Sequence, residues 1–378
     1  MSFDPNVKIG VLGGGQLGRM MIQSAIDINL EIKSMDPDPN APCKSIASEF
    51  VNGDIRDFDQ VMAFGESCDI ITVEIENVNI EALEALEKKG KKVYPQPHAL
   101  KTIKDKGIQK QFYVDNDIPT SDFVLTDSFE DIHQNKHLLP GVHKLRTEGY
   151  DGRGVQVIKT DADISKGFDK PSLIEKFVDY DREISVIVAR NEKGEMTTYP
   201  VVELEYHPEA NLVEFLFAPS SLSEDIKIKA RELAKKVISS LDMVGLLAVE
   251  MFATKDGEVI VNECAPRTHN SGHQTIEGNV TSQFEQHIRA ILGLPLGDTS
   301  ITGASVMINL LGEEGHTGVA KYEGLEEALQ IEGLHVHLYG KKLTKPFRKM
   351  GHVTLVGDDL NNLKTIARSV KHSIKIKA

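Results

Sequence analysis

Cysteine is scarce in this chain of 378 residues: Cys43, Cys68 and Cys264 lie far apart and form no CxxC pair. Sparse, scattered cysteines argue against a disulfide framework and indicate a reducing compartment, so we expect a cytoplasmic protein. No apolar run reaches the length of a membrane span, and residues 1–8 lack the basic and apolar regions of a signal peptide. We therefore expect no membrane partner.

Positive charge is also in deficit, because the formal net charge is −14. Non-specific nucleic-acid binding needs a basic surface, so we expect no nucleic-acid partner. An acidic total still permits a local basic pocket for a small phosphorylated molecule. The glycine-rich segments do not match GxxxxGK[ST], so a nucleotide site of the Walker type is not expected.

The length predicts two or three domains. In the first of them strands alternate with helices, which is typical of a parallel sheet. Two prolines, Pro95 and Pro97, break regular structure and predict a domain boundary. The predicted strands cover residues 7–12, 30–35 and 69–73, and the predicted helices cover 16–29, 55–66 and 80–89.

Beyond this boundary the pattern is mixed, with predicted helices at 104–116 and 226–241 and strand-like runs between them. Residues from 304 onward read as short strands with a final helix at 360–370. We therefore expect a fold of α/β and α+β type. The expected division is an N-terminal parallel-sheet domain at 1–97, a central domain at 98–297 and a small C-terminal domain at 298–378.

A glycine-rich turn, Gly13-Gly14-Gly15-Gln16-Leu17-Gly18, follows the first predicted strand and opens a helix. It satisfies GxGxxG, and Asp36 ends the next strand at the distance expected of a dinucleotide site. The same glycines suit any phosphate held at a helix N-terminus. They also suit a tight turn without a ligand. An NAD-dependent dehydrogenase is therefore one alternative function.

The carboxylates Glu250 and Glu263 lie on two predicted strands joined by Asp256-Gly257, a strong hairpin signal. A two-residue turn places Glu250 opposite Glu263 on one face. By the same register Phe252 faces Val261, and Lys255 faces Glu258. Opposed like charges are unfavourable, and a hard divalent cation such as Mg²⁺ between them removes the conflict. The alternatives are a pair that shares a proton or splays into solvent.

Asn262, beside this pair, points to the opposite face of a regular strand. It joins the site only if a bulge or the strand end turns it inward.

A second glycine-rich loop spans residues 143–157 and carries Gly149, Gly152 and Gly154. Glycine at this density lets a loop close over a ligand and present backbone N–H groups to phosphates. Lys144 and Arg153 supply positive charge on either side. The pattern predicts a mobile lid over a phosphorylated ligand, with a plain hairpin loop as the alternative.

Three further segments carry candidate binding residues. Residues 173–178 form a predicted strand whose edge suits a base, and Glu183 then suits ribose hydroxyls, although a charged strand end is equally compatible. Arg267, His269 and His273 follow the hairpin and suit a substrate pocket, whereas zinc lacks a third ligand. The basic run at 345–352 predicts either a phosphate clamp or a surface turn.

Taken in order, the segments IGVLGGGQLGRMM, TVEIENV, GYDGRG, EKFV, VNECAPRTHNSGH and RKMGHVTLVG resemble the ATP-grasp superfamily. Within it they resemble the N5-carboxyaminoimidazole ribonucleotide synthase family. The resemblance implies three domains, with ATP held between a lid subdomain at about 119–181 and a second sheet. It implies ATP and Mg²⁺ (or Mn²⁺) as cofactors, aminoimidazole ribonucleotide and bicarbonate as substrates, and a homodimer.

The resemblance also assigns residues, and we write them as expectations. ATP contacts are expected from Lys106, Lys144, Gly149, Tyr150, Asp151, Gly152, Arg153, Gly154, Val155, Glu175, Lys176, Phe177, Val178, Glu183, His207, Asn262 and Glu263. Metal ligands are expected at Glu250 and Glu263. The ribonucleotide is expected against Gln16, Leu17, Glu74, Glu76, Asn77, Tyr150, Asp151 and Arg153, with its phosphate at Lys345 and Arg348.

The catalytic residues expected are Arg267 for bicarbonate, Asp151 as a proton acceptor, and Tyr150, Arg153, His269 and His273 around them. The family usually has arginine where Lys106 stands, glycine where Glu148 stands and proline where Thr268 stands. Lys106 keeps the charge but not the bidentate fork of arginine.

The activity implied is phosphorylation of bicarbonate by ATP, followed by carboxylation of the amine. The alternatives are another ATP-grasp ligase, such as a formate-dependent glycinamide ribonucleotide transformylase, or a non-catalytic nucleotide-binding regulator.

Overall fold

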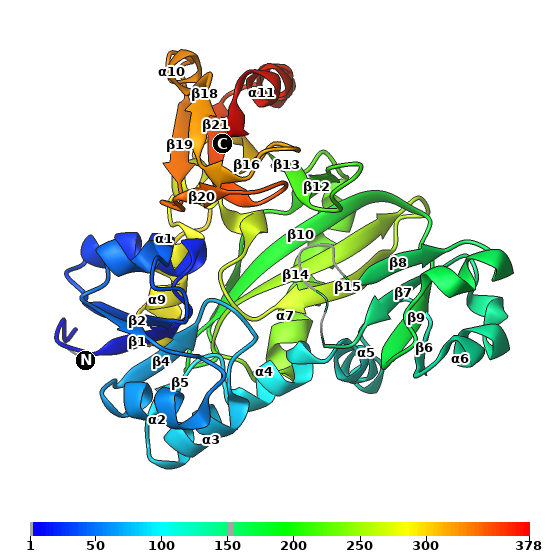
Figure 1. Ribbon diagram of the computed structural model, residues 1–378, viewed down its shortest axis with the longest axis horizontal. Helices are drawn as coiled ribbons and strands as arrows, with labels where there is room; N and C mark the ends of the chain where they lie inside the picture. The colour runs from blue at the N-terminus through cyan, green and yellow to red at the C-terminus, as the bar shows by residue number, and fades with distance from the viewer. Residues whose placement is uncertain (1–2, 148, 150–153) are drawn as a thin grey trace.

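The computed structural model describes residues 3–147, 149 and 154–378. Its N-terminal part is a five-stranded parallel sheet with helices packed on it, which confirms the predicted α/β pattern (Figure 1). The strand order is β3-β2-β1-β4-β5. These strands are β1 (Ile9–Leu12), β2 (Ile32–Asp36), β3 (Glu49–Asn52), β4 (Ile70–Val73) and β5 (Lys92–Val93), and the helices are α1 (Gln16–Ile26), α2 (Phe58–Glu66) and α3 (Ile80–Lys88). The short strands β3 and β5 were not predicted.

The predicted boundary at the two prolines is also the start of a helix. Pro97 occupies the first turn of α4 (Pro97–Lys104), where its missing N–H costs no hydrogen bond. Asp105 then accepts hydrogen bonds from the backbone N–H groups of Gly107 and Ile108 and so begins α5 (Lys106–Asp115). The chain thus passes from one domain to the next through two helices rather than a loose linker.

A nine-stranded sheet runs through the centre and into the C-terminal part of the molecule. Its main path is β15-β14-β10-β12-β13-β16-β21-β19, with β11 (Met196–Thr198) paired to β10. Because β13 pairs with β16, the C-terminal strands extend the central sheet. The bounds are β10 (Tyr180–Arg190), β12 (Val202–Tyr206), β13 (Val213–Ala218), β14 (Gly245–Thr254), β15 (Val259–Ala265), β16 (Ala304–Leu311), β19 (Leu334–Leu338) and β21 (Lys349–Gly357).

Helices cover this sheet and join it to the N-terminal part. The long helix α7 (Glu224–Ser240) packs on β10 and β14, and α11 (Leu360–Ser373) packs on β16 and β21. Helix α9 (Gln283–Ile291) packs against α1, and Phe284 and Ile288 share one core with Leu17 and Met21 (Figure 1). The smaller elements are α8 (Thr275–Gly278), α10 (Leu325–Ala328), β17 (Gly318–Val319), β18 (Lys321–Glu323), β20 (Leu343–Thr344) and β22 (Lys375–Lys377).

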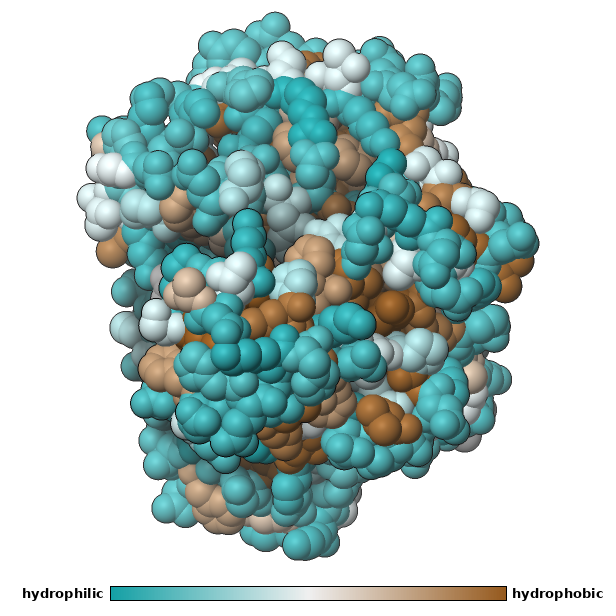
Figure 2. Space-filling view, turned by 90° about the vertical axis from the view of Figure 1, so that its right-hand side faces the viewer, coloured by the Kyte–Doolittle hydropathy of each residue, from teal (hydrophilic) through white to brown (hydrophobic). Residues whose placement is uncertain are grey.

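A further sheet, four-stranded and antiparallel, lies at the side of the molecule and is ordered β6-β9-β7-β8 (Figure 1). Figure 2 views the molecule from this side and shows apolar residues gathered across its middle between hydrophilic ones. Within the described ranges, no helix has the length and apolar character needed to cross a bilayer. The bounds are β6 (Phe123–Thr126), β7 (Gly141–Leu145), β8 (Val155–Ile158) and β9 (Ser172–Lys176), with α6 (Phe129–Gln134) beside them.

Candidate active site

The hairpin of β14 and β15 brings Glu250 directly opposite Glu263, as predicted. The predicted register nearer the turn is wrong, because Phe252 pairs with Ile260 rather than Val261. The turn is one residue longer than a two-residue loop: the backbone N–H of Thr254, rather than that of Lys255, donates to the carbonyl of Glu258. A β-bulge between these pairs and the glutamates restores the predicted alignment.

The bulge also decides where Asn262 points. It is the extra residue between the Met251–Val261 and Glu250–Glu263 pairs. The ammonium of Lys144, on the facing strand β7, donates a hydrogen bond of 2.8 Å to Asn262 Oδ1. Asn262 therefore faces the four-stranded sheet β6-β9-β7-β8, called the lid sheet below, and this inward orientation is the condition under which the sequence placed it in the site.

The two glutamates carry different charges in the metal-free protein. Burial, together with the neighbouring charge of Glu263, raises the pKa of Glu250 to about 8. Lys106, which forms an ion pair with Glu263, holds the pKa of Glu263 well below its usual range. These opposite directions favour a proton on Glu250 beside an ionised Glu263, which corresponds to the proton-sharing alternative considered from the sequence.

These residues suit a magnesium ion. Glu250, Glu263 and Asn262 offer only oxygen donors, and the Glu263 side chain keeps 37% of its surface exposed, so the pair is reachable from solvent. Among the described residues no cluster of three or more His, Cys, Asp or Glu side chains forms a complete metal cage. Mg²⁺ commonly binds through one or two carboxylates and fills its remaining positions with water and phosphate oxygens.

The Glu250→Gln variant tests the raised pKa of Glu250. Because the folded-state pKa lies above the ordinary value of 4.5, the stability that this group contributes is present below that value and lost as pH rises toward about 8. Without metal or nucleotide, the melting temperature of Glu250→Gln relative to wild type is therefore expected to be higher at pH 8 than at pH 5. Glu258→Gln, on the exposed turn, is the control and should show no such trend. Equal differences at both pH values for Glu250→Gln contradict the assignment.

Buried charged groups surround the glutamates on the lid side. Glu175 of β9 has a side chain only 5% exposed, and it lies 3.1 Å from Lys144 Nζ and 3.2 Å from Lys110 Nζ. The carboxylate expected to hold adenine is thus engaged by two lysines.

Burial alone would lower the pKa of Lys106, but Glu263 and Glu175 raise it above the ordinary value.

The glycine-rich turn at the start of α1 is filled by the protein's own carboxylates. The backbone N–H groups of Gly15 and Gly18 donate to the Glu74 side chain, the second at 2.7 Å. The backbone N–H of Gly14 donates to Asp36 Oδ2 at 2.7 Å. A phosphate would need these same donors, so the geometry supports the turn without a ligand and removes the basis of the dehydrogenase alternative.

Glu76 joins the N-terminal part to the segment that follows the hairpin. Its Oε1 lies 2.9 Å from Arg267 Nε, and Arg267 Nη1 donates to the carbonyl of Thr268 at 3.1 Å. The predicted neighbours of Glu76 differ in exposure: Asn77 is exposed, while Leu17 is 8% exposed within the core between α1 and α9.

The two histidines of the HNSGH segment, residues 269–273, lie at different depths. His269 Nε2 is 3.8 Å from Glu250 Oε1, so this ring borders the glutamate pair. His273 is 1% exposed and stacks on His352 at a centroid distance of 4.6 Å. Burial lowers the pKa of His273 well below its usual value, so this imidazole is neutral and forms part of the packing behind the site.

Comparison with known proteins links these features to one family. Three family models match consecutive parts of the chain: the ribonucleotide synthetase preATP-grasp domain at 6–104, the ATP-grasp domain at 111–284, and the phosphoribosylaminoimidazole carboxylase C-terminal domain at 305–365. N5-carboxyaminoimidazole ribonucleotide synthase of Synechocystis sp. is 36% identical over 94% of this chain and 93% of its own length. The chain belongs to the N5-carboxyaminoimidazole ribonucleotide synthase family.

Solved structures agree with this family membership. N5-carboxyaminoimidazole ribonucleotide synthetase from Thermotoga maritima superposes with a TM-score of 0.91 at 42% identity, covering 98% of this chain and 99% of that one. The ATP complex of the Aspergillus clavatus synthase gives 0.90 at 34% identity, over 97% and 98%. These matches confirm the expected ATP-grasp architecture with its preceding parallel-sheet domain.

Some curated relatives of this family are longer. Phosphoribosylaminoimidazole carboxylase of Vigna aconitifolia, a chloroplastic protein, is 39% identical over 95% of this chain. The chain spans only 66% of that relative and 63% of the Candida glabrata carboxylase, which is also 39% identical over 92% of this chain.

Among the lid residues that the family resemblance assigned, only some lie in the described ranges. Gly154 accepts a hydrogen bond from the Leu145 backbone N–H, and Val155 pairs with Lys144 at the start of β8. Gly149 is also described. Tyr150, Asp151, Gly152 and Arg153 lie outside the described residues, as does Glu148.

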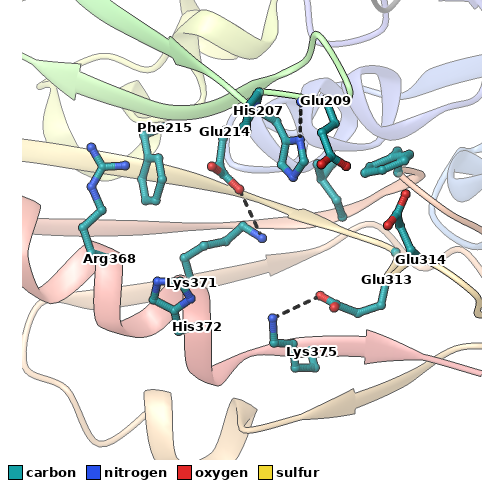
Figure 3. Close-up of a pocket in the computed structure, with 14 residues that line it drawn as sticks. His207, Glu209, Glu214, Phe215, Glu313, Glu314, Arg368, Lys371, His372 and Lys375 are labelled. Carbon is teal, nitrogen blue, oxygen red and sulfur yellow. Dashed lines mark hydrogen bonds and ion pairs between the residues drawn. The ribbon is translucent and has the colours of Figure 1, made fainter.

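His207, expected near the nucleotide in this family, lies at a separate cavity of about 500 Å³ (Figure 3). Its Nδ1 accepts hydrogen bonds from the backbone N–H groups of Glu209 and Ala210. The ring meets Phe347 edge to face, with centroids 5.5 Å apart. Within the described ranges, His207 makes no hydrogen bond or ion pair with the glutamate pair.

The expected phosphate clamp of the ribonucleotide lies beside Phe347. Lys345 is exposed, whereas the Arg348 guanidinium donates to the carbonyl of Leu343 at 2.7 Å. Two lysines near the glutamates were missed. Lys349 lies close enough to lower the pKa of Glu250, and Lys110 is buried against Glu175. The basic run at 345–352 could have pointed to Lys349 from the sequence. Lys110 is a single lysine in a predicted helix, and nothing around it in the sequence marks it as part of the site.

Proposed function

We propose that this chain catalyses the ATP-dependent carboxylation of 5-aminoimidazole ribonucleotide by bicarbonate, giving N5-carboxyaminoimidazole ribonucleotide for purine biosynthesis. The observation that carries the proposal is the opposed pair of Glu250 and Glu263 with Lys106 and Lys144 beside it. Solved relatives support the choice of ligands: one Aspergillus clavatus structure is a complex with ADP and 5-aminoimidazole ribonucleotide, at 33% identity and a TM-score of 0.89.

In this proposal Glu250 and Glu263 hold Mg²⁺, with Asn262 adjacent, and Mn²⁺ fits the same oxygen donors. When bound to these side chains, such a cation would supply positive charge opposite the phosphate oxygens of ATP. Lys106 and Lys144 contact the phosphates directly, and Gly149 to Val155 close over them. The strand edge at 176–178 holds adenine and Glu183 the ribose, with His207 assigned to the nucleotide by resemblance alone.

The reaction then has two steps. A bicarbonate oxygen attacks the γ-phosphorus of ATP, and ADP leaves, which forms carboxyphosphate. The amine of the ribonucleotide attacks the carboxyl carbon, inorganic phosphate leaves, and the amine proton passes to a base, for which Asp151 is the candidate. Arg267 binds the bicarbonate and its phosphorylated form. Carboxyphosphate is short-lived in water, so a closed lid protects the second step.

The ribonucleotide lies, in this proposal, against Gln16, Glu74, Glu76 and the neighbouring Leu17 and Asn77, with its phosphate at Lys345 and Arg348. The three parts of the chain divide the work: 1–97 binds the ribonucleotide, 98–297 binds ATP, and 298–378 completes the pocket. A homodimer, supported only by the resemblance, and a cytoplasmic location, supported by the sparse and scattered cysteines, accompany this proposal.

The test is product analysis with ¹³C-labelled bicarbonate. In the presence of ATP, Mg²⁺ and 5-aminoimidazole ribonucleotide, we expect one equivalent of ADP for each labelled carbamate carbon seen by NMR. Without the ribonucleotide, ADP release should fall sharply. Formate with glycinamide ribonucleotide is the comparison substrate pair. Turnover of that pair, or ADP release that ignores the ribonucleotide, contradicts the proposal.

A further inference from the structure

Lys110 is a buried cation that the proposed chemistry does not use. It lies on α5, and its side chain is only 3% exposed. The ammonium donates hydrogen bonds to Thr120 Oγ1 at 2.6 Å and Ser121 Oγ at 2.9 Å, and it lies 3.2 Å from Glu175 Oε2. A lysine this deeply buried is uncommon unless it is paired, so its partners indicate its role.

Glu175 connects Lys110 to the phosphate-binding side of the site. Its second oxygen, Oε1, lies 3.1 Å from Lys144 Nζ, and Ser121 Oγ donates to Oε2 at 2.9 Å. Lys144 is 10% exposed and also donates to Asn262 Oδ1. One carboxylate therefore sits between two ammonium groups, one on α5 and one on β7.

The charge of this group follows from its members. Two lysines and one glutamate leave one positive charge in excess. Without Lys110, Glu175 and Lys144 would form a neutral pair. The carboxylate of Glu175 would then neutralise the Lys144 ammonium, which faces the triphosphate in the proposed function. In a poorly solvated site, a unit charge a few ångströms from a phosphate strongly affects its binding.

We propose that Lys110 is a positioning residue for the triphosphate: by neutralising Glu175, it leaves the Lys144 ammonium free to act on phosphate oxygens. The inference rests on the proposed function, since it takes Lys144 as a phosphate ligand. It adds a residue on α5, outside the glycine loop and the hairpin, that sets the charge of the nucleotide site.

A merely structural role for Lys110 makes a different prediction from a charge-setting one. If Lys110 only ties α5 to the lid sheet, removing both Lys110 and Glu175 is worse than removing Lys110 alone. If Lys110 sets the charge, Lys110→Met leaves a net charge of zero, and adding Glu175→Gln restores the positive charge of Lys144. The double variant should then recover what the single variant loses.

The experiment measures binding of a non-hydrolysable ATP analogue and of inorganic triphosphate, each with Mg²⁺, by calorimetry. Lys110→Met is expected to weaken both by about tenfold. The double variant with Glu175→Gln should return triphosphate binding to within about threefold of wild type, and Lys110→Arg should retain most of it. Inorganic triphosphate separates the charge effect from any contact of Glu175 with adenine.

Lys101→Met, the same substitution at an exposed lysine of α4, is the control and should bind like wild type. The inference is overturned if folded Lys110→Met binds triphosphate like wild type, or if the double variant binds no better than the single one. Melting temperatures establish which variants are folded. Because binding is measured without turnover, a wild-type protein that binds ATP but fails to carboxylate the ribonucleotide refutes the proposed function alone.

A pH series gives a second reading of the same inference. Burial, opposed by Glu175 and Glu263 and reinforced by Lys144, lowers the pKa of Lys110 to about 8. Triphosphate affinity of the wild type should therefore fall as pH rises through that value, as the ammonium loses its proton. Lys110→Met has no such proton to lose, and its affinity should lack this step.

Discussion

Replacing Glu263 with glutamine is expected to lower ATP turnover by about three orders of magnitude while the protein remains folded. Glu263 lies opposite Glu250 and forms the ion pair with Lys106. The substitution removes charge from a proposed metal ligand and leaves the Lys106 ammonium without its carboxylate partner. ADP release with saturating Mg²⁺-ATP, bicarbonate and 5-aminoimidazole ribonucleotide measures the effect.

Glu258→Gln provides the matched control for that experiment. Glu258 ends the turn of the same hairpin, its side chain is 65% exposed, and its partner is Lys229 on the surface. This variant is expected to turn over at the wild-type rate, because an exposed ion pair contributes little. Full activity in Glu263→Gln with an unchanged requirement for Mg²⁺ would exclude Glu263 as a metal ligand.

Arg267→Lys is expected to lower kcat by about 100-fold while the affinity for ATP stays near the wild-type value. Arg267 pairs with Glu76 through Nε and bonds the Thr268 carbonyl through Nη1, so its planar group is held at two edges. Lysine keeps the charge but cannot hold Glu76, Thr268 and an oxyanion in one plane. Steady-state kinetics with bicarbonate varied, alongside calorimetry for ATP, separates the two effects.

Arg289→Lys is the comparison for this variant, because Arg289 also pairs with a glutamate, Glu285, through Nε and Nη2. Arg289 lies on α9, a different element from the hairpin that carries the glutamate pair. The Arg289→Lys variant is therefore expected to keep full activity. If the two arginine variants behave alike, the effect of Arg267→Lys is one of ion-pair loss rather than of bicarbonate binding.

The pairing of Glu250 with Glu263 could be predicted from the sequence, whereas the bulge beside it could not. A two-residue turn gave the correct pairing of Glu250 with Glu263, although the turn is longer and a bulge compensates for it. The bulge has a tertiary cause: Val261 donates its backbone N–H to the carbonyl of Pro119 and forms a bridge with Thr120. That contact comes from a segment remote in sequence, so hairpin rules alone could not include it.

The partners of the glycine-rich turn and the burial of Lys110 could not be predicted from the sequence, for a similar reason. A GxGxxG pattern does not reveal that Glu74, more than fifty residues further on, supplies the carboxylate that accepts the N–H groups of Gly15 and Gly18. Lys110 has no local signal, because its burial follows from contacts with Thr120, Ser121 and Glu175 of β9. In both cases the deciding partner comes from a different part of the fold.

The pairing of β13 with β16 has a consequence for cutting the chain. Phe217 faces Val306 and Leu216 faces Met307 along this seam, and the Phe217, Leu216 and Val306 side chains are at most 5% exposed. A fragment ending at residue 297 would expose the unpaired backbone amide and carbonyl groups along the edge of β13, together with apolar side chains that β16 normally covers. An unpaired strand edge of this kind pairs with strands of other molecules, so the fragment is expected to aggregate rather than fold as an independent domain.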